Sequence, residues 1–207
     1  DAITEVAEED THVAFWKQGD KEMNTDENLL QRFTLRRQPL IEDALQQWWL
    51  AARRTEGAQT ELGAAMGEIL GKAGHRTVLM PVYKALLDEF DAEEAEKDIE
   101  DDWIKDCRGA QGLSRVGFFD SIFELADIWT ESIGEKIYSE FLWRLLSHVT
   151  EMQDDSGSKR GWLNPEAGRF SEARGAGLSI SYLPSSSVDR LDMFHAEKVG
   201  DDFGEPL

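Results

Sequence analysis

The sequence is short of three things, and each shortage excludes a class of protein. A single cysteine, Cys107, among 207 residues excludes an internal disulfide framework and fits a reducing compartment. No apolar run approaches the roughly 20 residues that a membrane-spanning helix needs, and no signal peptide is recognisable. Only 22 lysines and arginines face 42 aspartates and glutamates. The resulting net charge of −20 argues against nucleic acid as a ligand, because phosphates would be repelled.

The chain does have enough apolar side chains for a packed core, since 41% of its residues are hydrophobic and 10% aromatic. It divides into an acidic N-terminal extension (1–34), a domain with helical periodicity (35–150) and a tail (151–207) that holds 7 of the 17 glycines and 3 of the 5 prolines. Such a tail cannot easily build a core of its own. The first residue is Asp1 rather than methionine, which indicates a processed product or part of a longer polypeptide.

The middle part predicts a mostly α fold. Its apolar side chains recur at i+3 and i+4, the pattern of amphipathic helices. Helices are expected at about 40–54, 78–87, 91–105, 118–129 and 137–149. Five glycines between Gly57 and Gly74 leave helix or loop undecided for residues 55–75, because each weakens a helix by roughly 1 kcal/mol.

The helix at 137–149 is apolar over most of its circumference. A helix of this kind is either fully buried or covered by another chain, and in a domain of this size we favour partial cover by a partner. We therefore predict a partner-binding cleft formed by Trp129, Phe141, Trp143 and Leu146.

The helix at 91–105 lies in the most acidic part of the chain. Residues 88–106 contain 11 acids and 2 lysines and supply −9 of the net charge. The plainer interpretation is a solvated face that keeps the protein soluble. The alternative is an acidic surface that docks a basic segment of a partner.

A twelve-residue segment from Asp106 to Gly117 separates the acidic helix from the Phe-rich helix. Leu113 is its eighth residue, and Phe118 follows its end. This frame resembles the EF-hand, in which a helix, a twelve-residue loop with an apolar eighth position and a second helix follow one another. In an EF-hand the eighth position forms a short strand that pairs with a sister loop.

The segment lacks most of the side-chain oxygens that calcium needs. A calcium loop supplies oxygens from positions 1, 3, 5, 7, 9 and 12. Here positions 3, 5 and 12 are Arg108, Ala110 and Gly117, so only Asp106 and Ser114 could contribute side-chain oxygens. We expect no metal and no cofactor at this loop.

EF-hands occur in pairs, so the resemblance implies a sister hand upstream, in one of two registers. One register puts Gly57 at the turn position, with Trp48-Trp49 in the entering helix. The other puts Gly71 at the turn and opens the exit helix at Val78. Neither register supplies the acidic ligands, so both hands are expected to be metal-free.

Longer stretches resemble one particular branch of that family. The runs 100–106 and 118–130, with Trp48-Trp49 upstream and residues 138–142 downstream, look like the divergent, calmodulin-like EF-hand modules of ciliary and flagellar axoneme proteins. The resemblance covers about Pro39–Val149. It implies a structural role in a microtubule-associated axonemal complex, in the cytoplasm and cytoskeleton of a cilium or flagellum. The implied partners are other protein subunits, with no nucleic acid and no membrane.

The tail has a local pattern of its own. Leu178, Ile180 and Tyr182 alternate with serines, which predicts an extended strand laid on a surface. A capping pattern at Ser186 predicts a short apolar helix that reaches Phe194. Because pieces this small cannot hold themselves together, we expect Leu178, Tyr182 and Phe194 to contact a partner.

We therefore predict a degenerate EF-hand pair with partner-binding extensions at both ends, acting as a non-catalytic interaction subunit. The alternative is a calcium-responsive sensor that uses an upstream loop. An enzyme would need a carboxylate site on the acidic helix, with a raised pKa at Asp101 or Asp102. The four histidines show no zinc-ligand spacing, and Cys107 has no assignable histidine partner.

Overall fold

The computed structural model describes residues 25–57, 69–130, 132–153, 159–160 and 179–191, and this part of the chain is mostly α, as predicted. Its helices are α2 (Asp26–Leu35), α3 (Pro39–Gly57), α5 (Lys72–Leu86), α6 (Ala92–Cys107), α7 (Arg115–Trp129) and α8 (Glu135–Val149). The strands are β1 (Ile69–Leu70), β2 (Leu113–Ser114), β3 (Thr150–Gln153), β4 (Lys159–Arg160) and β5 (Ser179–Tyr182). A short 3-10 helix, η3, spans Ser185–Ser187.

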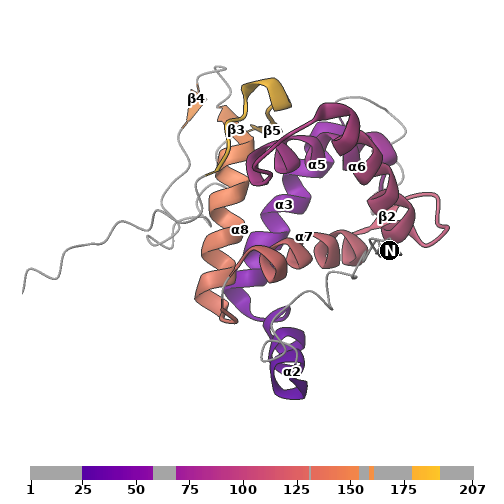
Figure 1. The fold of residues 1–207 in the computed structure, drawn as a ribbon. Coiled ribbons are helices and arrows are strands. Elements are labelled where there is room, and N and C mark those ends of the chain that lie inside the picture. The colour runs from indigo at the N-terminus through magenta and orange to yellow at the C-terminus, as the bar shows by residue number, and fades with distance from the viewer. Residues whose placement is uncertain (1–24, 58–68, 131, 154–158, 161–178, 192–207) are drawn as a thin grey trace, which may run out of the picture.

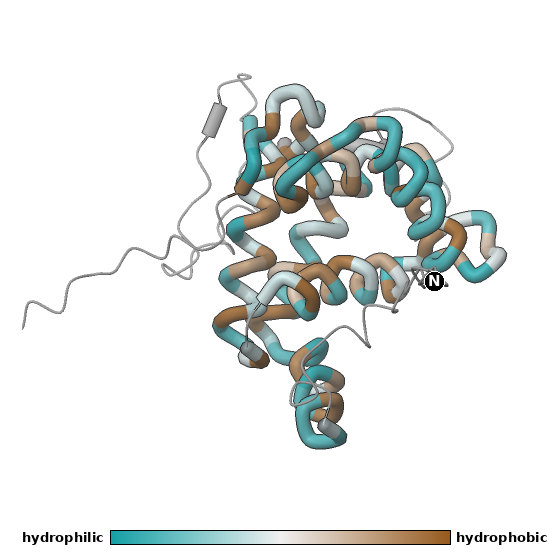
Figure 2. Tube along the Cα trace, in the orientation of Figure 1, coloured by the Kyte–Doolittle hydropathy of each residue, from teal (hydrophilic) through white to brown (hydrophobic). Residues whose placement is uncertain are grey.

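Helix starts follow local chemistry. Pro39 is the first residue of α3, where its missing N–H costs nothing. The carboxylate of Asp91 caps α6 by accepting from the backbone N–H groups of Glu93 and Glu94, at 2.9 and 2.8 Å. Proline at the first helical position and aspartate at the N-cap are both common at helix starts. Figure 2 shows that α6 is largely hydrophilic, whereas α8 carries hydrophobic residues along its length.

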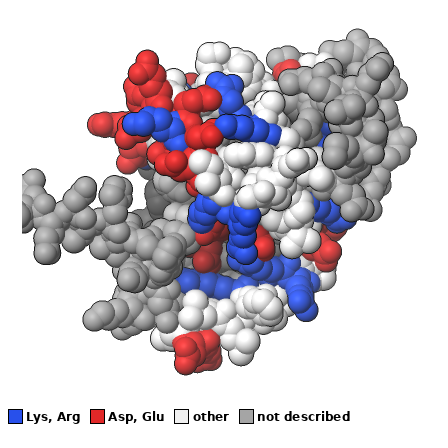
Figure 3. All heavy atoms as spheres, turned by 90° about the vertical axis from the view of Figure 1, so that its right-hand side faces the viewer, with Lys and Arg blue, Asp and Glu red and all other residues white. Residues whose placement is uncertain are grey.

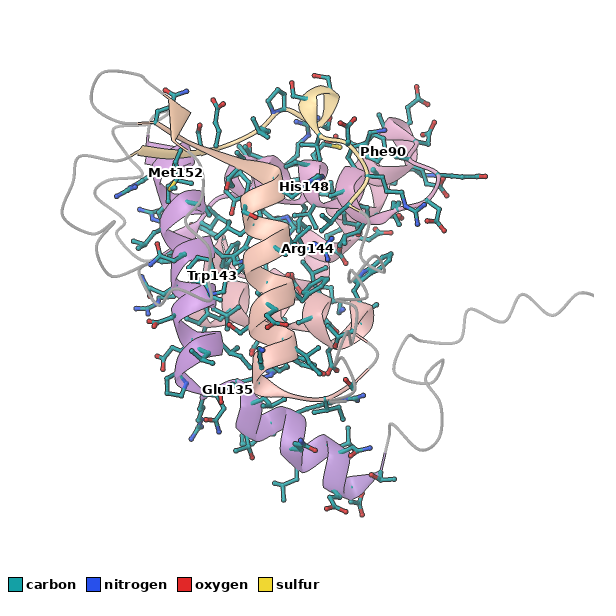
Figure 4. The ribbon with its side chains drawn as sticks, turned by 90° about the vertical axis from the view of Figure 1, so that its left-hand side faces the viewer. Phe90, Glu135, Trp143, Arg144, His148 and Met152 are labelled. Carbon is teal, nitrogen blue, oxygen red and sulfur yellow. The ribbon has the colours of Figure 1, made fainter. Side chains whose placement is uncertain are left out.

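The core lies between α3 and α8, with α5 and α7 packed against them (Figure 1). Trp48 of α3 is fully buried, and its indole N–H donates to the carbonyl of Leu142 on α8, at 3.0 Å. Figure 4 shows α8 alongside α3, with Trp143 on the side between them. Most apolar side chains of α8 therefore face the interior, while Lys136, Ile137, Glu140 and Arg144 are exposed.

The tail adds to this core in cis. β5 pairs antiparallel with β3, which continues directly from α8. The backbone N–H of Leu191 donates to the carbonyl of Ala85 on α5, at 2.7 Å, and both Val188 and Leu191 are buried. The domain predicted to end at residue 150 thus includes residues 179–191, because β3 offers β5 an edge with which to pair.

The predicted strand of the tail is confirmed by β5, but the predicted helix is wrong over its described part. Residues 185–187 form the 3-10 helix η3, and residues 188–191 are not helical. Their apolar side chains reach the core from an extended backbone instead. Leu178 and Phe194 lie outside the described residues.

α2 lies apart from the other helices, at the lower end of the molecule in Figure 1. It is joined to α7 by an ion pair between Arg32 and Asp127, at 3.0 Å, and it buries Leu35. Its residues Leu29, Leu30 and Phe33 are exposed. None of the helices in the described ranges is both long and apolar enough to cross a membrane.

Candidate functional site

Two short strands connect the loops that precede α5 and α7. β1 and β2 pair antiparallel, with Leu70 opposite Leu113. The next residues, Gly71 and Ser114, are the N-caps of α5 and α7. The strand expected at Leu113 is confirmed, and the same order of strand, cap and helix occurs twice.

This ladder fits neither of the two upstream registers. α5 begins at Lys72, well before Val78, and Gly71 is its N-cap in an extended conformation, with φ of −80°, rather than a turn residue. Gly57 is the last residue of α3. The partner of Leu113 is Leu70, and residues 58–68 before it lie outside the described chain.

Two residues of the Asp106–Gly117 segment, Arg108 and Ser114, define the ends of the flanking helices. Arg108 adopts a left-handed conformation, with φ of 48°, and ends α6. The Ser114 hydroxyl accepts from the backbone N–H of Gly117, at 3.1 Å, and so caps α7. Ala110 is exposed and carries no donor oxygen on its side chain. In the described ranges, no group of three or more His, Cys, Asp or Glu side chains is placed to hold a metal ion.

The leading carboxylate, Asp106, faces α5. Its Oδ2 lies 3.8 Å from Nε2 of His75, a side chain that is only 2% exposed. The His75 ring also meets the ring of Trp103, with centroids 5.4 Å apart. Sequence reasoning treated His75 as an isolated histidine, because its contact with Asp106 joins two segments that are distant in the chain.

Beside this contact, a groove opens between α5, α6 and α7, with a volume of about 250 Å³; we call it the central groove. Its apolar lining consists of Leu79, Val82, Leu86, Leu87, Leu125, Ile128 and Trp129. Its polar lining consists of Tyr83, Asp102, Lys105, Asp106, Ser121 and Glu124. The groove therefore combines an apolar surface with three carboxylates and a single lysine.

Burial disfavours the ionised form of two carboxylates in the groove, Asp102 and Glu124. Burial raises the pKa of Asp102, although its hydrogen bond from the Tyr83 hydroxyl, at 2.7 Å, acts in the opposite direction. Burial also raises the pKa of Glu124, and the ion pair with Lys105, at 3.3 Å, only partly offsets this. A cation brought by a ligand would stabilise both ionised groups.

An enzyme with a carboxylate site on α6 would need a raised pKa at Asp101 or Asp102, and the pKa of Asp102 is raised. Its nearest polar neighbour, the Tyr83 hydroxyl, is itself held protonated, because burial and the charge of Asp102 both raise the pKa of Tyr83. A protonated phenol that donates to a carboxylate is a stable hydrogen bond rather than an activated nucleophile. We therefore interpret the pair as part of the groove wall.

The structure corrects the cleft predicted from the sequence. Phe141, Trp143 and Leu146 are exposed by only 3%, 5% and 0%, because α8 is packed against α3, α5 and α7. Trp129 alone of the four residues is partly exposed, and it lines the central groove. Three of the four predicted residues thus form the interior.

Of the three tail residues predicted to contact a partner, only Tyr182 lies in the described part of the chain. Tyr182 is buried within the chain itself: its hydroxyl donates to the carbonyl of Trp48, at 3.3 Å, and its ring lies 6.2 Å from the Trp48 ring. Leu178 and Phe194 lie outside the described residues. Tyr182 therefore belongs to the core and not to a partner-binding surface.

Sequence reasoning missed most of the central groove. A solvated face was the plainer interpretation of the acids of α6, yet Asp102, Lys105 and Asp106, at spacings of three and four, all line the groove. That spacing was the available signal. The apolar stripe of α5, with Val78 and Val82, was recognised, but the sequence does not show which part of it stays uncovered.

Comparison with known proteins gave no match: no family model matches the chain, and neither does any curated protein or any solved structure. The class that the fold defines is a mostly helical domain with an apolar groove between three helices.

Proposed function

We propose that this chain is a non-catalytic interaction subunit of a larger protein assembly, and that the central groove is its main binding surface. The observation that carries the proposal is an apolar groove left open beside the buried core. Ile128 on its wall is 49% exposed, whereas Leu142 and Leu145 of α8 are fully buried. Apolar surface of this kind is a frequent mark of protein–protein contacts.

The chemistry of the groove favours a partner segment that has an apolar anchor and a lysine or arginine beside it. The anchor would remove Leu125, Ile128 and Trp129 from water, at roughly 1.5–3 kcal/mol for each large side chain that becomes fully buried. The cation would pair with Asp102 or Glu124, whose raised pKa values reflect incomplete compensation. This is the acidic docking surface that the sequence offered as an alternative for α6.

We also propose that the helical frame is a degenerate EF-hand pair and that the assembly is axonemal. The paired strands Ile69–Leu70 and Leu113–Ser114, each followed by a capped helix, support the first part. The second part rests on the resemblance of runs 100–106 and 118–130 to axonemal modules. In this proposal α8 fills much of the apolar face in cis, which leaves the central groove for a partner.

A retention assay in ciliated cells tests the role and the surface together. The tagged chain should stay with the detergent-extracted axoneme, and Ile128→Asp should release it. The matched control is Ile104→Asp, because Ile104 is 61% exposed on α6 and does not line the groove. Equal retention of both variants would rule out the groove, and a wild-type chain that never associates with the axoneme would rule out the location.

Calcium calorimetry distinguishes the proposal from the sensor alternative. Micromolar calcium binding by the full chain would favour a sensor that uses an upstream loop. We expect no saturable heat, because Arg108 and Ala110 stand where two ligands would be needed.

A further inference from the structure

We infer that the chain has a second docking surface, a basic groove between α2 and the start of α7, which takes an acidic-apolar segment of another protein. This surface is separate from the central groove, and its failure would leave the proposed function untouched. We call it the arginine groove. It has a volume of about 320 Å³, and Phe33, Arg36, Arg37, Val116, Phe119 and Asp120 are among the residues that line it.

Its apolar part is unusually exposed. Phe33 is 61% exposed and Val116 71% exposed, and the two face the same groove from different helices. On α2, Leu29 and Leu30 precede Phe33 by four and three residues, so they continue the stripe along the same helix face. An apolar stripe that runs into a groove offers a partner side chain a place to insert.

Its polar part has the opposite charge to the molecule as a whole. Arg36 and Arg37 line the groove with one carboxylate, Asp120, which is paired with Arg36. Arg115 lies at its edge, over the ring of Phe119 at 5.0 Å. Figure 3 shows Lys and Arg side chains in a band across the lower half of this face, while the acidic side chains gather mainly near its upper end. A cationic groove on a chain of charge −20 is a local exception.

The arginines are positioned in advance. The Arg36 guanidinium lies 4.8 Å from the centroid of the Phe123 ring, and that of Arg37 lies 5.6 Å from the centroid of the Phe33 ring. Stacking of this kind fixes the plane of a guanidinium while leaving N–H groups for a carboxylate. Arg37 makes no ion pair with any described residue, so its charge is the one most available to a ligand.

Charge complementarity therefore identifies the occupant as a segment with an aliphatic or aromatic anchor flanked by aspartate or glutamate. Arginine with aromatic side chains is also the composition that dominates binding energy at protein interfaces. A second copy of this chain is disfavoured, because two molecules of charge −20 repel each other at long range.

Fluorescence anisotropy with three labelled peptides of equal length tests the inference on the full chain. The first peptide combines leucine and phenylalanine at helical spacing with glutamates; the second has lysine for each glutamate; the third has serine for each apolar residue. We expect the first to bind, and to bind more weakly as NaCl rises from about 50 to 300 mM. Arg37→Glu and Phe33→Ser should each weaken it by about tenfold or more. The matched control is Lys97→Glu, an exposed cation on α6.

Each outcome has a distinct meaning. Stronger binding of the serine peptide, or equal loss of affinity in Lys97→Glu and Arg37→Glu, would overturn the inference. So would loss of the acidic peptide in Ile128→Asp, since that residue belongs to the central groove. Self-association in sedimentation velocity that Arg37→Glu abolishes would assign the arginine groove to a second copy and would also overturn it. Circular dichroism confirms that each variant is folded.

Discussion

α7 and α8 are helices of equal length, 15 residues, and both looked apolar in the sequence, but they have opposite roles in the structure. α8 buries Phe141, Leu142, Trp143, Leu145 and Leu146 among its neighbours. α7 buries Phe118, Ile122, Phe123 and Ala126 and leaves Val116 and Ile128 exposed near its two ends. α8 therefore turns all its apolar side chains except Ile137 into the interior, whereas α7 leaves apolar side chains at the surface near both of its ends.

The position of each helix in the fold explains this difference. α8 packs against α3, α5 and α7 and continues into β3. The early part of α7 lines the arginine groove with Val116 and Phe119, and its later part lines the central groove with Leu125 and Ile128. A partner could contact either end of α7 without disturbing the core.

The largest expected effect is the difference in unfolding free energy between a variant of α8 and a variant of α7. Leu142→Ala on α8 should lower the free energy of unfolding by about 2–5 kcal/mol, because it leaves a cavity at a position that is 0% exposed. Ile128→Ala on α7 should change it by less than about 0.5 kcal/mol, as exposed positions usually do. Urea denaturation followed by circular dichroism measures both; similar losses in the two variants would break the comparison.

The next largest expected effect is a loss of stability from a substitution just before the start of α7. A Cβ built on Gly112 would overlap the Ile69 side chain and lie 3.2 Å from the Leu70 carbonyl. Gly112→Ala should therefore cost about 1–3 kcal/mol through strain in the β1–β2 ladder. Gln111→Ala, at the exposed neighbouring position, is the control, and both are measured by thermal unfolding. If Gly112→Ala is as stable as Gln111→Ala, the ladder does not hold the start of α7 as described.

The smallest expected effect is a dependence of stability on pH. It comes from Glu124, on the side of α7 that faces the central groove. Burial raises the folded-state pKa of Glu124, so its stabilising contribution is complete below its ordinary pKa of about 4.3 and is lost as pH rises through the raised value. The stability of Glu124→Gln should therefore increase relative to the wild type as pH rises from about 4 to 7. Denaturant unfolding across this range gives the difference.

Glu96→Gln is the control with the opposite sign. A hydrogen bond from Arg76 lowers the pKa of Glu96, so its contribution is present above the ordinary value and is lost as pH falls. The stability of Glu96→Gln should decrease relative to the wild type as pH rises, by a small amount because both side chains are exposed to solvent. Equal slopes for the two variants would show that the groove does not desolvate Glu124.

The sequence was sufficient for most of the helices. The apolar periodicity predicted helices close to the observed α3, α6, α7 and α8. α5 starts earlier than expected, at Lys72, because Gly74 is buried within the helix, where tertiary packing outweighs its poor helix propensity.

The functional surfaces could not be predicted in the same way. An all-round apolar helix has the same pattern whether its own domain or another chain covers it, so the sequence of α8 did not exclude a partner. The elements that cover α8, mainly α3, are distant from it in the sequence: Trp48 donates to the carbonyl of Leu142. The two grooves likewise depend on which helix faces are left uncovered, and periodicity within one helix does not show this.

The docking of β5 has a consequence for synthesis of the chain. Residues 179–191 complete a core that includes α3, so a ribosome must add another 134 residues after Trp48 before that residue can meet Tyr182. Until then β3 has an unpaired edge, and the nascent domain displays apolar surface that Ile180, Val188 and Leu191 later cover. A chain that is truncated before residue 179 is therefore expected to fold in lower yield, because this edge and this apolar surface stay uncovered.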